Sequence, residues 1–340
     1  MRRRLKGNRL VIILLAVLAL DLGAAVWASW SMVPAGSGEE VLVKIPQGLS
    51  STQIADSLKA RGVLKGTRLF RLALRLGDDN LKAGRYLFRK PQAPGKVLSK
   101  LRRGETEKTW LRIPEGLWMD ETAGLIAQQL DLDSLKLSQE IRRPQAYNYE
   151  FLESARDLEG LLFPDSYAFE YPVREEDVLP RLLGRCDEVL RRLRASYSLE
   201  ETGLTLREWI VLASIVEAET MLDSERERVA AVYRNRLALG MKLEADPTVI
   251  YGLGVRKKRL YYKHLEDDSP YNSYRNKGLP PGPICSPGER SLEAVLRADL
   301  SEPNLYFVAR GDGGHFFSAT FQEHLEKVDL VRNGRKPPSP

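Results

Sequence analysis

The amino-acid sequence predicts an α+β protein built in three successive parts: an N-terminal transmembrane helix, a small β-α-α-β domain and a larger α+β domain. Three observations predict this order: an apolar run close to the N-terminus, a strand–turn–helix pattern that occurs twice, and long helical segments followed by turns rich in glycine and proline. With 340 residues, the chain is long enough for about two domains and a sizeable core.

The composition is that of an ordinary globular protein, with 43% hydrophobic and 29% charged residues. It excludes global disorder, collagen and a small disulfide-linked scaffold. The net charge of +6 is mild, and no basic stripe is interleaved with aromatic residues, so we expect no nucleic-acid partner. Three histidines and two distant cysteines, Cys186 and Cys285, offer no metal-ligand spacing, so we expect neither a metal nor another cofactor.

Residues 1–9 carry five basic side chains and no acidic one, and the apolar run 10–33 follows directly. A membrane-spanning helix needs about 20 apolar residues, whereas a secretory signal peptide has a shorter apolar region. We therefore expect a single-pass, uncleaved signal anchor whose N-terminal tail stays in the cytoplasm by the positive-inside rule. Asp21 lies in mid-span, where it would be tolerated as a neutral acid or would face a partner helix.

A strand–turn–helix pattern occurs twice in the chain. VLVKIPQGLS begins at Val41 and WLRIPEGLW begins at Trp110, and each is followed by an amphipathic helical segment. The first copy continues through a second helix at 67–76 and a strand at 84–88, an order that resembles a LysM-like module. LysM modules bind glycans that contain N-acetylglucosamine, although a purely structural module would have the same pattern.

These patterns set the expected domains. Residues 34–40 read PAGSGEE and form a flexible linker after the anchor. Residues 41–90 form the small LysM-like subdomain and residues 91–330 the larger domain, with 91–205 either part of that domain or a bridge. The final segment, 331–340, is expected to be a disordered tail.

The segment Leu206–Thr220 is the strongest candidate for a functional helix. It is apolar nearly all round and should therefore be buried, yet it carries Glu217 and Glu219 close to its C-terminal end. Burial and the negative end of the helix dipole both raise the pKa of a carboxyl group. A carboxylic acid that is protonated at neutral pH is what a glycosidic leaving oxygen needs.

The two glutamates lie about 200° apart around the helix and should not share one site. The stripe above Glu217 includes Ala213 and Ser214, whose small side chains leave room for a ligand, whereas the bulkier Val216 lies above Glu219. We therefore expect Glu217 to be the acid. A solvated glutamate near a helix end is the alternative that the residues alone leave open.

Turns farther along the chain carry the aromatic, amide and hydroxyl groups that sugar-binding sites use. The candidate groove residues in these turns are Asp246, Thr248, Tyr251, Asn272 and Tyr274. His315 could donate a hydrogen bond at the same groove or be a satisfied turn histidine.

Six motifs follow one another in the chain: ASIVEAET, RNRL, DPTVIYG, YNSY, GLPPGPI and GGHFFS. In this order they resemble the membrane-anchored endolytic murein transglycosylases of the MltG/YceG-like family, and the resemblance covers nearly the whole chain, to about residue 330. It implies that the glutamate of the ASIVE motif, Glu217, is the catalytic residue. Glu244 and Cys285 are modest departures from the family pattern.

The resemblance also implies a reaction. Such enzymes are lyases that cut the β-1,4 bond between N-acetylmuramic acid and N-acetylglucosamine within nascent peptidoglycan strands, leave 1,6-anhydro ends and act as terminases of glycan elongation. A single glutamate acts as acid and then as base, while the sugar's own 6-hydroxyl attacks C1. The residues expected to bind substrate are Asp246, Thr248, Tyr251, Asn272, Tyr274, Ser214 and Glu219.

The same resemblance implies the partners: peptidoglycan glycan strands, the bacterial cytoplasmic (inner) membrane, and cell-wall synthases such as penicillin-binding proteins. The catalytic domain would lie on the periplasmic or extracellular side. Three other interpretations stay open. A non-catalytic glycan-binding protein would be indifferent to Glu217, a muramidase would need a second carboxylate from Glu219, Asp246 or Glu244, and a scaffold for synthases is compatible with either.

Overall fold

The computed structural model describes residues 15–25, 38–76, 80–257 and 260–333. The chain divides into two compact units: unit 1 consists of Met1–Trp110 and Ala168–Val173, and unit 2 consists of Leu111–Tyr167 and Arg174–Pro340. Helices are accompanied by strands that pair into two-stranded sheets. The predicted α+β class is confirmed.

The N-terminal predictions fall mostly outside the described residues. This holds for the tail 1–9 and for all of the predicted span 10–33 except residues 15–25, which form a helix. Within the described part of the chain, no helix is both long and apolar enough to cross a membrane. At the other end, helix α13 (Phe321–Arg332) reaches into the predicted tail 331–340, whose last seven residues are not described.

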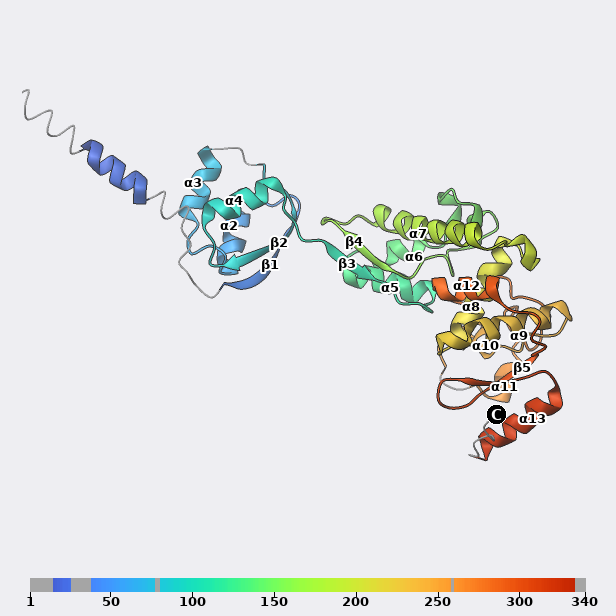
Figure 1. Cartoon of the computed structure of the whole chain (residues 1–340). Helices are drawn as coiled ribbons and strands as arrows, with labels where there is room; N and C mark the ends of the chain where they lie inside the picture. The colour runs from blue at the N-terminus through green and yellow to red at the C-terminus, as the bar shows by residue number, and fades with distance from the viewer. Residues whose placement is uncertain (1–14, 26–37, 77–79, 258–259, 334–340) are drawn as a thin grey trace, which may run out of the picture. The chain divides into compact units, whose positions relative to one another are not determined.

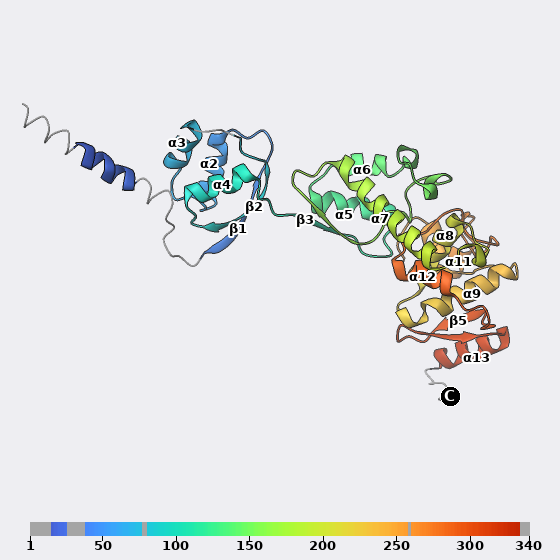
Figure 2. The same ribbon diagram turned by 45° about the horizontal axis from the view of Figure 1, so that its top comes forward.

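Unit 1 follows the order β-α-α-β and then adds a further helix. Its elements are β1 (Glu39–Ile45), α2 (Ser51–Ala60), α3 (Arg68–Leu76), β2 (Gly84–Lys90) and α4 (Pro94–Arg103). The two strands pair antiparallel, from Glu39 opposite Lys90 to Ile45 opposite Gly84. In both views the three helices gather on one side of this strand pair (Figures 1 and 2).

Local sequence explains how unit 1 forms. Ser50 begins α2 through a capping box, in which its hydroxyl accepts from the Gln53 N–H at 3.3 Å and the Gln53 side chain accepts from the Ser50 N–H at 2.9 Å. Alternate residues of β1, Val43 and Ile45, point inward and join Tyr86 of β2 in a buried apolar core. Burial of this core holds the strands and helices together.

The second copy of the strand–turn–helix pattern begins where the chain passes from unit 1 to unit 2. Strand β3 (Thr109–Arg112) leads to α5 (Met119–Leu130), and β3 pairs with β4 (Ser166–Phe169). The turn glycine has a positive φ in both copies, 86° at Gly48 and 75° at Gly116, a conformation that favours glycine. The two copies therefore share one local structure although they open different units.

Unit 2 is mostly helical. After α5 its helices are α6 (Ser134–Glu140), α7 (Glu175–Ser196), α8 (Leu206–Glu219), α9 (Arg226–Ala238), α10 (Asp246–Gly252), α11 (Tyr262–Leu265) and α12 (Glu289–Arg297). Short 3-10 helices are η1 (Pro144–Ala146), η2 (Glu150–Leu152), η3 (Glu200–Thr202) and η4 (Asp223–Glu225). Strand β5 (Tyr306–Ala309) pairs antiparallel with β6 (His315–Ser318), and α13 packs on both strands.

Helix α8 packs against α9, α10 and α12 (Figure 1). Thr205 caps its N-terminus through a capping box with Glu208. All residues from Trp209 to Val216 are buried, as the apolar sequence predicts. The Trp209 indole N–H also donates to the carbonyl of Leu292 in α12 at 2.8 Å. This packing fixes the C-terminal end of α8 and, with it, the two glutamates.

Candidate functional site

Glu217, close to the end of α8, is held by donors from α9 and α12. Its Oε2 accepts from the Ser291 hydroxyl at 2.8 Å, from the Gly288 N–H at 3.1 Å and from the Arg226 guanidinium at 3.2 Å. The side chains of Glu217 and Arg226 are 8% and 9% exposed. Three donors on one oxygen tie α8 to its neighbours, and breaking a buried ion pair of this kind is strongly destabilising.

Glu115, in the Ile-Pro-Glu-Gly turn of the second strand–turn–helix copy, lies close to Glu217. Its carboxyl lies against Gly288, where an added Cβ would meet Glu115 Oε1 at 1.9 Å and displace the Glu115 side chain. Burial and then the negative charge of Glu217 raise the pKa of Glu115, while two arginines oppose the shift. The sequence offered no signal for this contact, because the two segments lie far apart in the chain.

Glu219 has different surroundings, as its position on the helix predicts. Among the described residues it receives one hydrogen bond, from the Tyr233 hydroxyl at 3.0 Å, and it lines a cavity of about 230 Å³. That volume holds several waters or roughly one sugar ring. Burial raises the pKa of Glu219 to about 7; the Tyr233 hydrogen bond opposes this shift and the negative charge of Asp246 adds to it.

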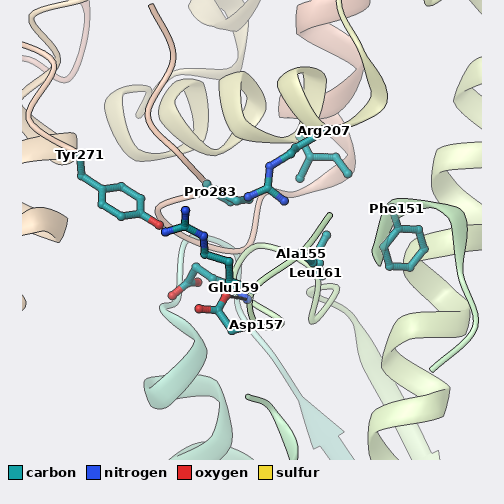
Figure 3. Close-up of a pocket in the computed structure, with 11 residues that line it drawn as sticks. Phe151, Ala155, Asp157, Glu159, Leu161, Arg207, Tyr271 and Pro283 are labelled. Atoms are coloured by element: carbon teal, nitrogen blue, oxygen red, sulfur yellow. Dashed lines mark hydrogen bonds between the residues drawn. The ribbon is translucent and has the colours of Figure 1, made fainter. Parts of the chain in front are cut away.

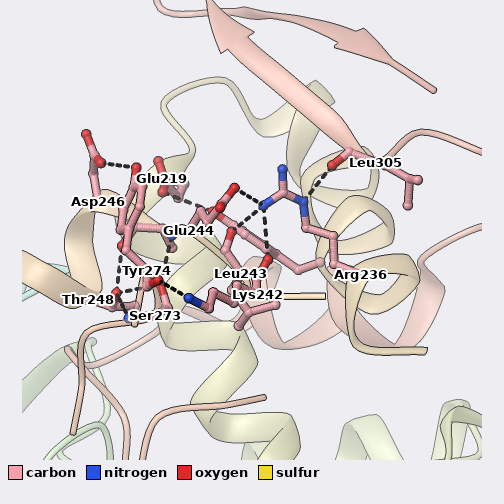
Figure 4. Close-up of polar contacts among 12 residues, drawn as sticks. Glu219, Arg236, Lys242, Leu243, Glu244, Asp246, Thr248, Ser273, Tyr274 and Leu305 are labelled. Atoms are coloured by element: carbon pink, nitrogen blue, oxygen red, sulfur yellow. Dashed lines mark hydrogen bonds and ion pairs between the residues drawn. The ribbon is translucent and has the colours of Figure 1, made fainter. Parts of the chain in front are cut away.

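Polar side chains surround this cavity (Figure 4). Tyr274 donates from its hydroxyl to Asp246 at 2.7 Å, and Asp246 begins α10. Glu244 accepts from the Arg236 guanidinium at 3.2 Å. The full lining consists of Glu219, Tyr233, Arg236, Leu243, Glu244, Asp246, Tyr274, Phe307, Ala309 and His315.

The RNRL motif on α9 positions two walls of the cavity. Arg236 is 7% exposed and donates to the carbonyls of Leu305 at 2.6 Å and Leu243 at 2.8 Å. Asn235 donates from its side-chain amide to the carbonyl of Glu302 at 2.9 Å. One short motif therefore holds both the loop before α10 and the loop before β5. Its side chains give the buried carbonyl groups of these loops the hydrogen-bond donors that they need.

His315, the first residue of β6, also lines the cavity. Its Nδ1 lies 2.9 Å from Glu225 Oε2, and its backbone N–H donates to the same oxygen at 2.9 Å. Arg310 forms an ion pair with Glu225 at 3.5 Å. The two expectations for His315 therefore do not exclude each other, because the residue is fixed in its turn and still borders the cavity.

The structure brings together three of the residues predicted to bind substrate, since Glu219, Asp246 and Tyr274 line one cavity. It places Tyr251 elsewhere. The Tyr251 hydroxyl donates to Glu159 at 3.1 Å, and its ring meets the Trp118 ring edge-on with centroids 5.3 Å apart.

Ser214, Thr248 and Asn272, which the sequence predicts to contact substrate, are 0% exposed in this structure. The Ser214 hydroxyl accepts from the Ile284 N–H at 3.0 Å, so the GLPPGPI turn fills the room expected above Glu217. Thr248 donates to the carbonyl of Ala245 at 2.6 Å, and Asn272 donates to two carbonyls of its own loop. These side chains hold turns in place.

Glu159 is a second buried carboxyl, and sequence reasoning missed it. It accepts from the Met119 N–H at 3.0 and 3.1 Å, from the Gly160 N–H and from the Tyr251 hydroxyl. Burial raises its pKa to about 7 against these hydrogen bonds. The adjoining cavity of about 20 Å³ has room for about one water (Figure 3). The sequence did contain a signal for this buried carboxyl, because Glu159 is an acidic residue inside the apolar run LEGLLF.

Similarity to known proteins gives the class of this protein. A sequence model described as the YceG-like family matches residues 43–330, so the chain belongs to the YceG-like family. It is 31% identical over 300 residues to an endolytic murein transglycosylase of Bacillus subtilis, covering 84% of this chain and 82% of that protein.

Two further comparisons agree. The chain is 29% identical over 329 residues to an endolytic murein transglycosylase of Streptococcus pneumoniae D39, covering 87% of this chain but 59% of that protein. It is also similar to the crystal structure of a yceG-like protein from Listeria monocytogenes, with a TM-score of 0.59 and 33% identity, covering 86% of this chain and 100% of that chain.

Proposed function

We propose that this YceG-like protein is an endolytic murein transglycosylase, a lyase that cuts peptidoglycan glycan strands. The observation that carries the proposal is the Glu219 carboxyl, whose pKa is raised to about 7 and which borders a cavity lined by tyrosines and carboxylates. Such a group can deliver a proton to a glycosidic oxygen at neutral pH. The names of the bacterial relatives support the same reaction.

We propose Glu219 as the acid on the geometry of the cavity, and Glu217, the glutamate that the family resemblance implies, stays the alternative candidate. Glu217 holds three donors from Arg226, Ser291 and Gly288 and does not line the cavity. Within the described residues, Glu219 has a hydrogen bond from Tyr233 alone, so the rest of its carboxyl can meet a substrate. Glu219 therefore offers its carboxyl group to a molecule in the cavity.

The proposed reaction uses one carboxyl group twice. Glu219 first gives its proton to the oxygen that leaves C1 of N-acetylmuramic acid, and the C1–O bond breaks. The carboxylate then takes the proton of the sugar's 6-hydroxyl while that oxygen bonds to C1. No water is consumed, and the acid is restored. The attack is intramolecular, which favours it over reaction with solvent.

Asp246 supports a second candidate function, because it lies in the same cavity and carries a second carboxylate. A muramidase would use such a group to activate water or to bond to C1. The mass of the products separates the two functions, since hydrolysis adds one water to each cut.

We further propose that the apolar run 10–33 anchors the protein in the bacterial cytoplasmic membrane, with unit 2 on the outer side. The basic tail 1–9 supports this orientation. The β-α-α-β order of unit 1 supports a LysM-like glycan-binding role, and cutting within nascent strands would make the enzyme a terminase working beside cell-wall synthases. Membrane fractionation and protease accessibility test the anchor. Recovery of the chain in the soluble fraction would contradict it, and so would resistance of unit 2 to a protease added on the outer side of the membrane.

The test of the proposed activity is a digest of purified glycan strands by the full-length chain. Wild type, Glu219→Gln and Glu217→Gln are compared, and the products are measured by mass spectrometry. We expect wild type to release fragments with 1,6-anhydro ends and Glu219→Gln to release none.

Glu217→Gln should release as many anhydro products per folded molecule as wild type, although fewer molecules of the variant are folded. Loss of cleavage in Glu217→Gln alone would return the acid to the residue that the sequence favoured. Products that carry the added water in wild type would support the muramidase, and binding without cleavage would contradict both enzymes.

A further inference from the structure

Helix α3 of unit 1 has an outward face that the proposed reaction does not use. We propose that this face docks on the membrane in which the chain is anchored and binds its anionic phospholipid headgroups. The proposal rests on the anchor proposed above for the apolar run 10–33, and not on the choice of the catalytic glutamate.

Charge is distributed unevenly along the chain. Residues 38–110, which make up most of unit 1, contain 16 lysines and arginines against seven aspartates and glutamates, a net charge of +9. Residues 111–340 contain 31 against 38, a net charge of −7. The part of the chain that directly follows the predicted anchor is therefore the basic part.

Helix α3 is apolar on two sides, and only one of them is buried. Phe70 and Leu74 point into the core of unit 1. Leu72 and Leu76 lie one turn apart on the opposite side of the helix and are 49% and 81% exposed. In both views α3 lies at the edge of the helices that cover β1 and β2 (Figures 1 and 2). The packing of unit 1 therefore leaves these two leucines without a cover.

Two exposed arginines flank the leucines. Arg68 comes four residues before Leu72 and Arg75 three residues after it, so the three side chains share one face. Among the residues that the structure describes, neither arginine has an ion-pair partner, whereas Arg71 is paired with Asp56 of α2. The outward face of α3 thus combines uncompensated positive charge with exposed apolar side chains.

The length of the connecting chain keeps unit 1 close to the membrane. The apolar run ends at Val33 and β1 begins at Glu39. Even a fully extended chain spans only about 20 Å over this stretch, which is less than the diameter of about 30 Å expected for a domain of this size. A tether this short gives a weak docking contact a high effective concentration of membrane surface.

The chemistry of the face favours a membrane over other occupants. Basic side chains are attracted to anionic headgroups, and leucines gain by entering the boundary between headgroups and acyl chains. A soluble polyanion would pair with the arginines but leave the leucines in water. Two α3 faces brought together would place like charges opposite each other.

The experiment uses the full-length chain in vesicles that contain a lipid with a photoreactive acyl chain. One set of vesicles is phosphatidylcholine, and the other also contains phosphatidylglycerol. After irradiation, mass spectrometry measures the yield of lipid crosslinked to α3 and to the run 10–33. The peptide with Leu239, which is 64% exposed in unit 2, is the matched control for an exposed leucine.

We expect lipid to crosslink to α3 about tenfold more in vesicles with phosphatidylglycerol than in those without it, and the Leu239 peptide to stay at background. The double variant Arg68→Gln/Arg75→Gln should lower the yield at α3 about tenfold. Removal of the same charge from unit 2, in Arg142→Gln/Arg143→Gln, should leave it unchanged. A high salt concentration should lower the wild-type yield without any substitution.

Absence of crosslinks at α3 in the anionic vesicles overturns the docking, and so does an equal yield in neutral vesicles or at high salt. Crosslinks at the run 10–33 without crosslinks at α3 would keep the anchor and remove the docking. Absence of crosslinks at the run 10–33 is a different result, because it contradicts the proposed anchor itself. The glycan digest is independent of all these outcomes.

Discussion

Glu159 and Glu219 are both buried carboxyl groups of unit 2, and burial raises the pKa of each to about 7. Their surroundings differ. Glu159 accepts from two backbone N–H groups and from Tyr251, beside a cavity of about 20 Å³ (Figure 3). Glu219 accepts from Tyr233 and borders about 230 Å³ (Figure 4).

The comparison separates burial from function. A raised pKa reports that a carboxyl group has lost water, and structural and catalytic groups share that property. What distinguishes Glu219 is that, in the part of the chain that the structure describes, its carboxyl accepts only from Tyr233 and has a cavity next to it. Glu159 uses its oxygens to cap the start of α5 and to hold Tyr251 in α10.

The largest expected effect is on the rate of glycan cleavage, which should differ between variants of Glu219 and Glu159. Glu219→Gln should lower the rate of glycan cleavage by about 10³-fold, because it removes the proton donor. Glu159→Gln should keep the rate within a few-fold of wild type. Single-turnover digestion of glycan strands measures both, and equal losses in the two variants would remove the distinction.

The next effect concerns stability and pH. The folded protein keeps the proton of Glu159 up to about pH 7, whereas the unfolded chain releases it at the ordinary value of 4.5. Folding stability therefore falls as the pH rises through this window, by up to about 3 kcal/mol for this one group.

Glu159→Gln resembles the protonated acid at every pH. Its stability should match wild type near pH 5 and exceed it at pH 8. Glu219 and Glu115, whose pKa values are also raised, continue to contribute to the pH dependence of the variant. Urea unfolding at the two pH values measures this difference, and a parallel fall in variant and wild type would contradict the assignment to Glu159.

A smaller effect is expected on the pH dependence of cleavage when the hydrogen bond from Tyr233 to Glu219 is removed. The Tyr233 hydroxyl donates to Glu219 and lowers its pKa, so Tyr233→Phe should raise that pKa further. The basic limb of the cleavage profile should then move to higher pH by about 0.5–1 unit. A shift to lower pH, or none, would show that another group controls this limb.

The smallest effect tests the structural role of Tyr251. Tyr251→Phe removes one hydrogen bond to Glu159 and should cost about 1 kcal/mol of folding stability. In a digest of glycan strands, the ratio of reducing ends to 1,6-anhydro ends should not change, because Tyr251 does not line the Glu219 cavity. An altered ratio would instead support the sequence prediction that Tyr251 binds substrate.

The sequence was most informative where local patterns decide the structure. Apolar residues all round α8 predicted its burial, and the Ile-Pro-x-Gly turns predicted both strand–turn–helix copies. The angle between Glu217 and Glu219 also predicted that they would have separate surroundings. These features depend on residues that are neighbours along the chain.

The choice between the two glutamates depends on distant segments. Ser214 leaves space on an isolated helix, but the turn at Ile284 fills it and donates to the Ser214 hydroxyl. Gly288 and Ser291 then donate to Glu217. No pattern within α8 could indicate these partners, and the same holds for the α5 N-terminus that Glu159 caps.

One measurement tests the central claim that two carboxyl groups are protonated near neutral pH and one of them meets substrate. Carbon NMR of the full chain labelled at glutamate carboxyls, with Glu159→Gln and Glu219→Gln for assignment, follows both groups through a pH titration. We predict that both titrate near pH 7 and that adding a peptidoglycan disaccharide shifts the signal of Glu219 while leaving that of Glu159 in place. Titration of Glu219 near its ordinary value, or a ligand response at Glu159 or Glu217 in its stead, would contradict the account.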